Sequence, residues 1–411
     1  MSKLEQPTNE VSAIAEQGGG RVTKVEQLIQ QYCPDGVEYK KLGDVLSVNR
    51  GRRLTKMQLS DDGQYFVYHG SKDTPLGKYT QFNVKGNTTI VVNTGGIGGV
   101  KFCDDDFWCS DGSFWIGHSD LLNDKFVYYY LSPLESYFAS QKRVGGVPTI
   151  DRSVVENVEI PLPPLPVQEE IVRILDTFAE LQAELQAELQ ARIQQYNYYR
   201  NQLLSFDDNN IRILQLQQCV SDDCSISYGI VQPGDDYFEG IPVVRPVDLS
   251  KRIIHIQGIK TVKPELLHSY SRTELKGGEL LVCVRGTTGV VSFAGDDLRG
   301  GNVSRGIVPL RFNSLVDAHY MYHLFNSDYV RTQIANKTRG AALQQINVGD
   351  FKKISIPIPP ITEQKRIAAI LDRFDTLTTD ITAGLPAEIE ARRKQYEYYR
   401  DRLLTFNRKI V

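Results

Sequence analysis

EIPLPPLPVQEEIVRILDTF at residues 159–178 and SIPIPPITEQKRIAAILDRF at residues 355–374 are two versions of one stretch. Each leads into a long helical pattern, which ends as QYNYYRNQLLSF at 195–206 and as QYEYYRDRLLTF at 395–406. A segment that recurs about half a chain apart indicates internal duplication. The sequence therefore predicts two similar halves, each ending in a long helix.

The first copy has the pattern of a helix with one apolar face. Ile171, Ile174, Leu175 and Phe178 recur at three- and four-residue spacing, and the repeat AELQAELQAELQA continues the stripe. Because a four-residue step overshoots one turn by about 40°, the stripe drifts around the helix. From 167 to 206 this helix would be about 60 Å long, and packing against another element must stabilise it.

The second copy supplies a helix for this packing. Its stretch between the ILD run and the QY run is four residues longer and contains Gly384 and Pro386. We expect a break there, with Pro386 starting a second helical segment. Two similar helices that each follow a globular stretch predict an antiparallel, coiled-coil-like pair with a domain at each end.

The globular halves also resemble each other. VVNTGGIGGVKF at 91–102 aligns without gaps on VCVRGTTGVVSF at 282–293, which matches Gly95 with Gly286, Gly98 with Gly289 and Phe102 with Phe293. Each run predicts a strand, a glycine turn and a second strand. The expected fold is α+β: two mixed α/β domains separated by two long antiparallel helices, with internal pseudo-twofold duplication. The expected domains are a mobile tail (1–24), a first domain (25–160), a central helix (161–208), a second domain (209–356) and a C-terminal helix (357–411).

Composition limits the class of protein. Hydrophobic residues make up 41% of the chain and charged residues 24%, with a net charge of −3, which is typical of a globular protein and not of one that coats nucleic acid along its length. No run is apolar enough to cross a membrane, and residues 1–20 lack the apolar core of a signal peptide. The six cysteines show no CxxC pairing, so we expect free thiols in the cytoplasm.

Enzyme and metal motifs are mostly absent. No GxxxxGK[ST] phosphate loop occurs, and the glycines at 95–99 do not open a helix. Pro34-Asp35 with Glu38 and Lys40 superficially resembles a nuclease motif, but its elements are too close together for two strands. His319 and His323 share a helix face at i, i+4, for which we favour packed histidines over a metal site.

Basic and polar residues gather in loops of both halves. Glycine gives these loops freedom, and Arg and Lys side chains suit phosphates and guanine edges. For each residue alone, a solvated surface position is the alternative. The candidate DNA-binding residues are Arg50, Arg52, Arg53, Lys56, Ser71, Lys72, Lys78 and Tyr79 in the first half, and Arg245, Arg285, Thr287, Asn302, Ser304, Arg305 and Arg339 in the second.

Together these motifs resemble one family. The duplicated PLPP…Q…I…ILD.F entry, the four-residue helical repeat, GLPAEIEARRKQYEYYRDRLL at 384–404 and PDGVEYKKLG at 34–43 are similar to the specificity subunit of type I restriction–modification systems, of the IC type. The resemblance covers nearly all of the chain after the N-terminal tail. The sequence departs from the pattern in that tail and in its AELQ repeats, where relatives often carry a Thr-led version.

The resemblance implies two target-recognition domains, each binding one half of an interrupted double-stranded DNA sequence. The helices would set the spacing and dock two methyltransferase subunits, while two restriction–motor subunits complete the complex. S-adenosylmethionine, ATP and Mg²⁺ would belong to these partners, and this chain would be non-catalytic and without a cofactor. We expect the helical aromatic residues to pack at a helix junction or to dock subunits, rather than to stack on bases. The candidate docking residues are Phe178, Tyr196, Tyr199, Phe374, Tyr396 and Tyr399.

Two other classes remain open from the residues alone. A coiled-coil scaffold with two protein-binding domains would share the helical pattern but would have no salt-dependent, sequence-selective affinity for DNA. An enzyme with an unrecognised site has little support, because no group of carboxylate, His or Cys residues stands out. Unlike a scaffold, a DNA-recognition subunit needs the basic loops in both halves.

Overall fold

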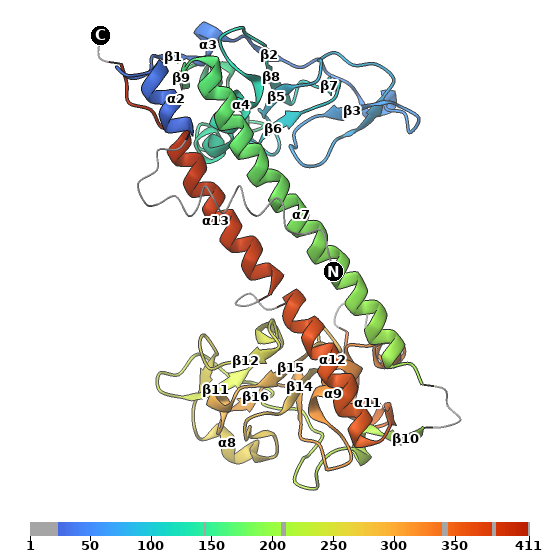
Figure 1. Cartoon of the computed structure of the whole chain (residues 1–411). Coiled ribbons are helices and arrows are strands. Elements are labelled where there is room, and N and C mark those ends of the chain that lie inside the picture. Colours follow the sequence, from blue (N-terminus) through green and yellow to red (C-terminus); the bar gives the residue numbers. More distant parts are fainter. Residues whose placement is uncertain (1–23, 144, 207–210, 339–343, 380–383, 410–411) are drawn as a thin grey trace. The chain divides into compact units, whose positions relative to one another are not determined.

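The computed structural model describes residues 24–143, 145–206, 211–338, 344–379 and 384–409 (Figure 1). The chain forms two compact units: unit 1 comprises residues 1–186 and 389–411, and unit 2 comprises residues 187–388. The border between the units falls within the long helices, so each unit contains helix from both copies of the repeat. The predicted mobile tail, apart from Lys24, lies outside the described residues.

Unit 1 is built on a four-stranded sheet with the order β2-β8-β5-β6 and a three-stranded sheet with the order β4-β3-β7. The long strand β5 pairs antiparallel with β6 and with β8, whereas β3 and β7 are parallel. A small pair of strands, β1 and β9, joins the start of the unit to the segment before its long helix. The strands are β1 (Tyr39–Lys41), β2 (Val48–Arg50), β3 (Tyr65–Tyr68), β4 (Gly77–Tyr79), β5 (Thr88–Val92), β6 (Val100–Cys103), β7 (Trp108–Cys109), β8 (Ser113–Ile116) and β9 (Glu159–Pro161).

Unit 2 repeats this plan except for the fourth strand of its larger sheet, since β12 is parallel to β15 whereas β2 is antiparallel to β8, at the other edge. Its sheets have the orders β12-β15-β14-β17 and β13-β11-β16, and β10 pairs with β18 as β1 pairs with β9. The parallel pair of the second sheet is β11 and β16. The strands are β10 (Arg212–Gln215), β11 (Ile241–Val244), β12 (Ile253–Ile254), β13 (Thr261–Val262), β14 (Leu280–Cys283), β15 (Val291–Ala294), β16 (Asn302–Val303), β17 (Ile307–Leu310) and β18 (Ser355–Ile358).

The predicted match between the two glycine turns is confirmed. Gly95 and Gly98 have φ values of 81° and 89°, and Gly286 and Gly289 have φ values of 91° and 88°, a region that favours glycine. The Gly98 amide donates to the Val92 carbonyl at 2.9 Å, and the Gly289 amide donates to the Cys283 carbonyl at 2.8 Å. The hairpins β5–β6 and β14–β15 are therefore equivalent, residue by residue.

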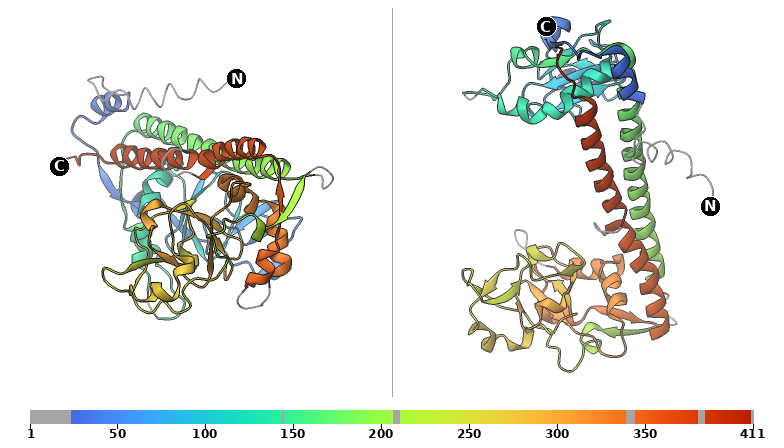
Figure 2. Two further views of the ribbon diagram at one scale, coloured as in Figure 1. Left: turned by 90° about the horizontal axis from the view of Figure 1, so that it is seen from below. Right: turned by 60° about the vertical axis from the view of Figure 1, so that its left-hand side comes forward.

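The first half ends in one long helix, and the second half ends in two consecutive helices. The helix α7 (Leu165–Leu203) has 39 residues and corresponds to about 58 Å at 1.5 Å per residue. The second copy is divided into α12 (Ile361–Thr379) and α13 (Leu385–Leu403), so the predicted break with Pro386 in the first turn of a second segment is confirmed. Within unit 1, α13 lies beside the first part of α7 in each view of Figures 1 and 2, and the helices are antiparallel.

Shorter helices accompany the sheets in both units. They are α2 (Lys24–Tyr32), α3 (Leu42–Val45), α4 (Asp124–Leu131), α5 (Glu135–Ser140), α6 (Arg152–Glu156), α8 (Leu266–Ser269), α9 (Ala318–Phe325), α10 (Asp328–Lys337) and α11 (Val348–Lys352). All six cysteines are free thiols, as predicted.

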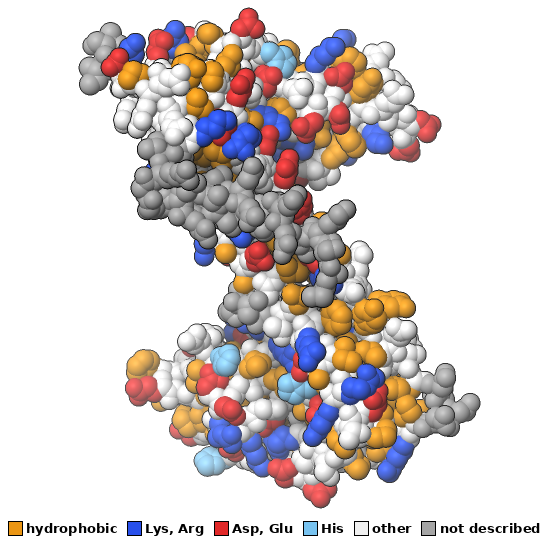
Figure 3. All heavy atoms as spheres, viewed as in Figure 1, with side chains coloured by type: hydrophobic (Ala, Val, Ile, Leu, Met, Phe, Trp, Pro, Cys, Tyr) orange, Lys and Arg blue, Asp and Glu red, His pale blue; other side chains and the backbone are white. Residues whose placement is uncertain are grey.

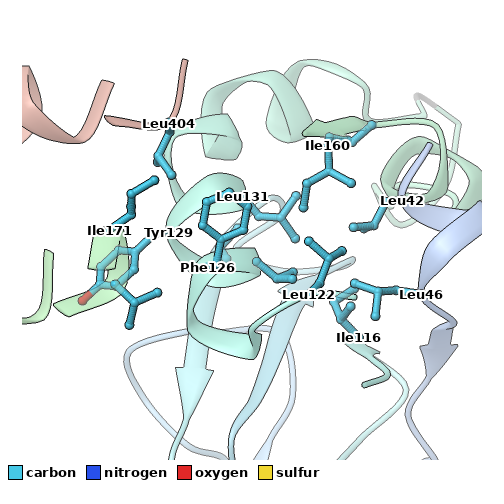
Figure 4. Packing of buried hydrophobic residues seen from close by; sticks show 14 of the residues in the cluster. Leu42, Leu46, Ile116, Leu122, Phe126, Tyr129, Leu131, Ile160, Ile171 and Leu404 are labelled. Carbon is cyan, nitrogen blue, oxygen red and sulfur yellow. The ribbon is translucent and has the colours of Figure 1, made fainter. Parts of the chain in front are cut away.

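The core of unit 1 joins elements that are far apart in the sequence. Figure 4 shows Leu42, Phe126, Ile160, Ile171 and Leu404 in one packed cluster, and each of them is buried. These side chains come from α3, α4, β9, α7 and the segment after α13. The hydrophobic effect therefore holds both long helices against the sheets and short helices of unit 1.

The Gln of the PLPP…Q entry, Gln168 in unit 1 and Gln364 in unit 2, is fully buried and connects two helices by hydrogen bonds. In unit 1, the Gln168 amide donates to the Leu121 and Pro163 carbonyls at 2.9 and 2.6 Å and accepts from the Asn123 amide at 2.8 Å. Gln364 makes the equivalent bonds in unit 2, to Leu315, Pro359 and Asp317, at 2.9, 2.8 and 2.9 Å. Asn123 and Asp317 are also the N-caps of α4 and α9. Each Gln thus ties the start of a long helix to the capped start of a domain helix.

The segment after α13 lies beside the residues that precede β1, where Val37 and Arg408 form an isolated parallel bridge. The Val37 amide donates to the Asn407 carbonyl at 2.8 Å, and the Lys409 amide donates to the Val37 carbonyl at 3.0 Å. Gly36, at φ +93°, lies so close that a Cβ atom there would be 2.7 Å from the Asn407 carbonyl oxygen. In unit 1, hydrogen bonds therefore connect the segment after the long helix α13 to the segment before β1. In unit 2, the corresponding elements α7 and β10 are consecutive in the chain.

Candidate nucleic-acid interface

In unit 2, several strands end at one edge, which we call the strand-end edge. Parallel strands β11 and β16 end there in register, with Val244 opposite Val303, and β14 ends beside the start of β17, with Cys283 opposite Ile307. The residues that follow these strand ends include Arg245, Arg285 and Arg305. The topology thus brings together three of the predicted DNA-binding arginines from positions up to 60 residues apart.

The three arginines differ in whether the side chain is ion-paired. The Arg245 guanidinium donates to the Asp248 carboxylate at 3.0 and 3.1 Å, and this hydrogen bond raises the pKa of Arg245. Arg285 is half-buried and Arg305 is exposed, and neither side chain makes an ion pair with a described residue. Their backbones are held, because the Arg305 amide donates to the Ile230 carbonyl at 2.8 Å and the Arg285 carbonyl accepts from the Cys283 thiol at 3.3 Å. Arg285 and Arg305 are thus available cations on an ordered frame.

The prediction that Asn302 and Ser304 belong to a free loop is wrong, because Asn302 lies in β16 and both side chains are buried. Asn302 is fully buried: its carbonyl oxygen accepts from the Thr273 hydroxyl at 2.7 Å, and its amide donates to the Tyr270 carbonyl at 3.0 Å. Ser304 is 8% exposed. Asn302 supports the loop that carries Arg305, because a buried side-chain amide must satisfy its hydrogen bonds within the protein. Thr287 is exposed in the glycine turn, and Arg339 lies outside the described residues.

In unit 1, the corresponding edge is flanked by a basic loop, residues 51–58. The Arg52 amide donates to the Cys109 carbonyl at 2.9 Å, and the Trp108 indole donates to the Arg52 carbonyl at 2.8 Å. Leu54 is buried against Val67 and Trp108 and anchors the loop. The side chains of Arg50, Arg52, Arg53 and Lys56 are exposed. This loop and the last residue of β2 therefore present four solvent-exposed basic side chains, and the loop backbone is fixed.

The other unit 1 candidates are partly engaged. Lys72 donates to both oxygens of Glu135 at 2.7 Å, and the Ser71 hydroxyl accepts from the Thr74 amide at 3.1 Å. Lys78 lies 5.5 Å from the centre of the Phe66 ring, and Tyr79 packs edge-on against Trp108 at 5.1 Å. Lys72 is neutralised by its ion pair, whereas Lys78 stays exposed on the strand β4.

Charge on the surface is local rather than continuous. On the side shown in Figure 3, Lys and Arg side chains are interspersed with Asp and Glu side chains in both units. This distribution agrees with the net charge of −3. Any nucleic-acid contact must therefore use particular loops, not a uniformly basic face.

The candidate docking aromatics form two internal junctions. In unit 1, Phe178 of α7 lies 6.3 Å from Tyr396 and 5.6 Å from Tyr399, measured between ring centres. In unit 2, Phe374 of α12 lies 6.3 Å from Tyr196 and 5.7 Å from Tyr199. Packing at a helix junction, one of the two predicted roles, is what the structure describes. The neighbouring Tyr198 and Tyr398 are 63% and 61% exposed.

The predicted packing is confirmed for His323, which is fully buried, but not for His319, whose side chain is 55% exposed. His319 and His323 bond to the Asp372 carboxylate at 2.8 and 2.7 Å, and the Arg252 guanidinium contacts both His319 and Asp372. Arg252 supplies the positive charge that a metal ion would otherwise bring. No group of three or more His, Cys, Asp or Glu side chains suited to a metal was found among the residues described.

Asp111 is a further residue of the unit 1 edge, and the sequence analysis missed it. It follows β7, which is parallel to β3, and its carbonyl accepts from Arg50 Nε at 3.2 Å. The available signal was the Ser-x-Gly pattern, since Ser110-Asp111-Gly112 corresponds to Ser304-Arg305-Gly306. The gapless alignment of 91–102 with 282–293 did not reach it.

Comparison with known proteins agrees with the geometry. A family model described as the type I restriction modification DNA specificity domain matches twice, at residues 34–195 and 232–391. The chain belongs to this specificity family. The two matches cover the two halves that the repeated helix entry and the equivalent hairpins define. The predicted family and two-domain α/β architecture are thereby confirmed.

Individual members of the specificity family are similar over most of the chain. A putative type I restriction enzyme specificity subunit from Haemophilus influenzae is 30% identical over 410 residues, which cover 90% of this chain and 96% of that protein. The EcoR124I/EcoR124II specificity subunit from Escherichia coli is 35% identical over 304 residues, covering 69% of this chain and 70% of that one.

Solved structures share the fold. The type I restriction–modification S subunit from M. genitalium has a TM-score of 0.60 at 15% identity, with 90% of this chain and 96% of that chain covered. A chain from a structure of type I R-M complex assembly and conformational transition has a TM-score of 0.53 at 18% identity and covers 90% and 97%. Among the described residues, no helix is long and apolar enough to span a membrane.

Proposed function

We propose that this member of the specificity family is the non-catalytic DNA-recognition subunit of a type I restriction–modification complex. Each unit would bind one half of an interrupted double-stranded DNA target. The observation that carries the proposal is the strand-end edge, where each unit holds arginines on an ordered backbone. They are the exposed Arg52 and Arg53 in unit 1, and the half-buried Arg285 and the exposed Arg305 in unit 2. Arginine donates two hydrogen bonds to a guanine edge or pairs with a phosphate.

The duplicated helices would connect this recognition to the other subunits. Two equivalent aromatic junctions, each beside an exposed tyrosine at Tyr198 or Tyr398, suit two copies of one methyltransferase subunit. Aromatic side chains with one polar end are common at protein interfaces. Two restriction–motor subunits would complete the complex. S-adenosylmethionine, ATP and Mg²⁺ would bind to these partners.

The experiment is to map methylated bases in cells that contain the chain and its methyltransferase subunit. A bipartite methylated motif that disappears when this chain is deleted is the expected result. Unchanged methylation in the presence of an active methyltransferase would overturn the proposal. A coiled-coil scaffold, the alternative, predicts that outcome together with no sequence-selective DNA affinity.

Single substitutions at the strand-end edge of unit 2 should affect one half of the target. Arg285→Ala and Arg305→Ala are each expected to weaken binding about tenfold and to relax one or two base positions of the second half-site, because a guanidinium contact to a base is lost. Binding of the complex to DNA libraries, varied separately in each half-site, measures this effect.

Arg299→Ala is the matched control for these substitutions. Arg299 is also exposed in unit 2, but it follows β15 and so lies near the start of β14, away from the strand-end edge. Its removal should leave both half-sites unchanged. Equal losses at the two half-sites in Arg285→Ala or Arg305→Ala would show that these arginines do not belong to one recognition site.

A further inference from the structure

The strand-end edges of the two units are equivalent at the level of single hydrogen bonds. The Ser110 amide donates to the Tyr68 carbonyl at 3.0 Å, and the Ser304 amide donates to the Val244 carbonyl at 2.9 Å. The Asn93 amide donates to the Gly112 carbonyl at 3.0 Å, as the Val284 amide donates to the Gly306 carbonyl at 2.8 Å. These bonds align Ser110-Asp111-Gly112 with Ser304-Arg305-Gly306.

The aligned positions carry opposite chemistry. Asp111 in unit 1 stands where unit 2 has Arg305, and the residue between the flanking Ser and Gly is therefore an acceptor in one unit and a donor in the other. An ionised carboxylate only accepts hydrogen bonds, and a guanidinium only donates them. A difference of this kind at one position of a shared frame is expected if the two units distinguish different bases.

Hydrogen bonds hold Asp111 in place but leave one of its carboxylate oxygens without a partner among the described residues. Its carbonyl oxygen accepts from Arg50 Nε at 3.2 Å and from Asn93 Nδ2 at 3.3 Å, which orients the loop. Its Oδ1 accepts from the Ser110 hydroxyl at 3.2 Å and lies 3.4 Å from His69 Nδ1. Its Oδ2 has no hydrogen bond to any described residue, and 29% of the side chain is exposed. One carboxylate oxygen is thus available to a ligand.

The surroundings favour a base over a phosphate as that ligand. A carboxylate is repelled by phosphate, so a carboxylate at a DNA interface is placed to contact base edges. Arg50, Arg52 and Arg53 are exposed in the adjoining segment and can neutralise the DNA backbone around it. In the major groove, Asp accepts from exocyclic amino groups, of which cytosine N4 is the usual one and adenine N6 the other.

We propose that Asp111 is a specificity-determining residue of unit 1, whose carboxylate accepts a hydrogen bond from an exocyclic amino group in the first half-site. The inference rests on the proposed DNA-recognition function and adds the identity of the contact. Arg305 occupies the equivalent place in unit 2 and contacts a hydrogen-bond acceptor there. The two half-sites therefore differ in donor and acceptor pattern at the position that faces this loop.

The test compares Asp111→Asn with the unchanged chain, each in complex with its methyltransferase subunit. Methylated motifs are mapped across a genome, and binding is measured with libraries varied in each half-site. Asn keeps an oxygen for Ser110 and His69 but loses the charge and gains a donor. One base pair of the first half-site should lose about tenfold of its discrimination, with the second half-site unchanged. The base found at this position in the motif of the unchanged chain shows whether the amino group belongs to cytosine or to adenine.

Asp105→Asn is the matched control, because Asp105 is exposed and precedes β7, at the end of that strand opposite Asp111. It should leave the motif unchanged. If Asp111→Asn keeps the full motif, or weakens both half-sites equally, the inference is overturned. Thermal unfolding of each variant shows whether folding is intact, and Asp111→Glu tests the same contact in a variant that retains the charge. Absence of any motif in the unchanged chain would instead defeat the proposed function.

Discussion

At the scale of single residues, Asp372 organises the junction between α9 and α12. Burial opposes its charge, but hydrogen bonds from His319, His323 and Arg252 outweigh burial and hold the pKa of Asp372 well below its usual range. Burial lowers the pKa of His323, whereas the bond to Asp372 raises the pKa of His319. Unit 1 places Asp176 at the same position, where it accepts from Lys125 and Tyr129 at 2.9 and 2.6 Å.

These shifts predict that unit 2 is sensitive to acid. An Asp with a lowered pKa in the folded state contributes stability above its unfolded pKa of about 3.9, and the contribution is lost as the pH falls toward the folded value. His323 acts in the same direction below about pH 6.5, because the unfolded chain binds a proton that the buried ring resists. His319 acts oppositely, since its raised pKa stabilises the fold below about pH 6.5 and that effect is lost as the pH rises. The free energy of unfolding should therefore fall between about pH 5 and pH 3.

Asp372→Asn tests this dependence. The variant should lose about 2–3 kcal/mol of stability at pH 7, because the largely buried Arg252 loses one of its two carboxylate partners and keeps only Asp375. It should also unfold with a weaker dependence on pH between about 5 and 3. Urea unfolding at a series of pH values measures both effects. An unchanged pH dependence would mean that Asp372 is not the group responsible.

At the scale of elements, the buried Gln joints explain why the PLPP…Q entry occurs twice. A proline carbonyl before each long helix needs a hydrogen-bond donor, as the N-cap residue of each domain helix needs an acceptor for its amide. One Gln side chain supplies both. Gln364→Ala should cost about 2–3 kcal/mol, because the Asp317 amide and the Leu315 and Pro359 carbonyls lose their partner. Urea unfolding measures this change.

The adjacent Glu363→Ala is the control for the joint. Glu363 pairs with Arg366 at the exposed surface, and its loss should cost about 0.5 kcal/mol. Gln168→Ala should reproduce the large effect in unit 1, where the hydrogen bonds are the same. Similar small losses of stability in all three variants would show that the hydrogen bonds of Gln168 and Gln364 are not a main source of the stability of the two units.

At the scale of the whole molecule, the proposed function implies that the length of α7 sets the number of unread base pairs between the two half-sites. Insertion of one further AELQ repeat after Gln190 adds about 6 Å and about 40° of rotation to the helix. Since one base pair is about 3.4 Å, the unread gap of the methylated motif should lengthen by one or two base pairs while both half-sites stay the same. Methylome mapping measures the gap.

A length-preserving change in the same repeat, Gln186→Glu, serves as its control and should leave the gap unchanged. A constant gap after the insertion would show that α7 does not set the spacing. Loss of one half-site would show instead that the insertion disturbs a unit, because residues 187–203 of α7 belong to unit 2 and the preceding part to unit 1.

The sequence by itself determined the features that depend on local backbone rules and periodicity. The spacing of Ile171, Leu175 and Phe178 predicted the long helix, Pro386 predicted its break in the second copy, and the glycines at 95 and 286 predicted equivalent turns. Each of these depends on residues within a few positions of one another, where φ preference and side-chain spacing decide the structure.

Only the tertiary structure decided which side chains are free to bind. Asn302 was expected to be open but is buried under Thr273 and Tyr270, and Lys72 is paired with Glu135, 63 residues away. Asp111 and Arg305 became equivalent only once parallel strand pairs placed them at matching edges. Burial and ion pairing depend on contacts between distant segments, and no short-range pattern in the sequence encodes which strands will become neighbours.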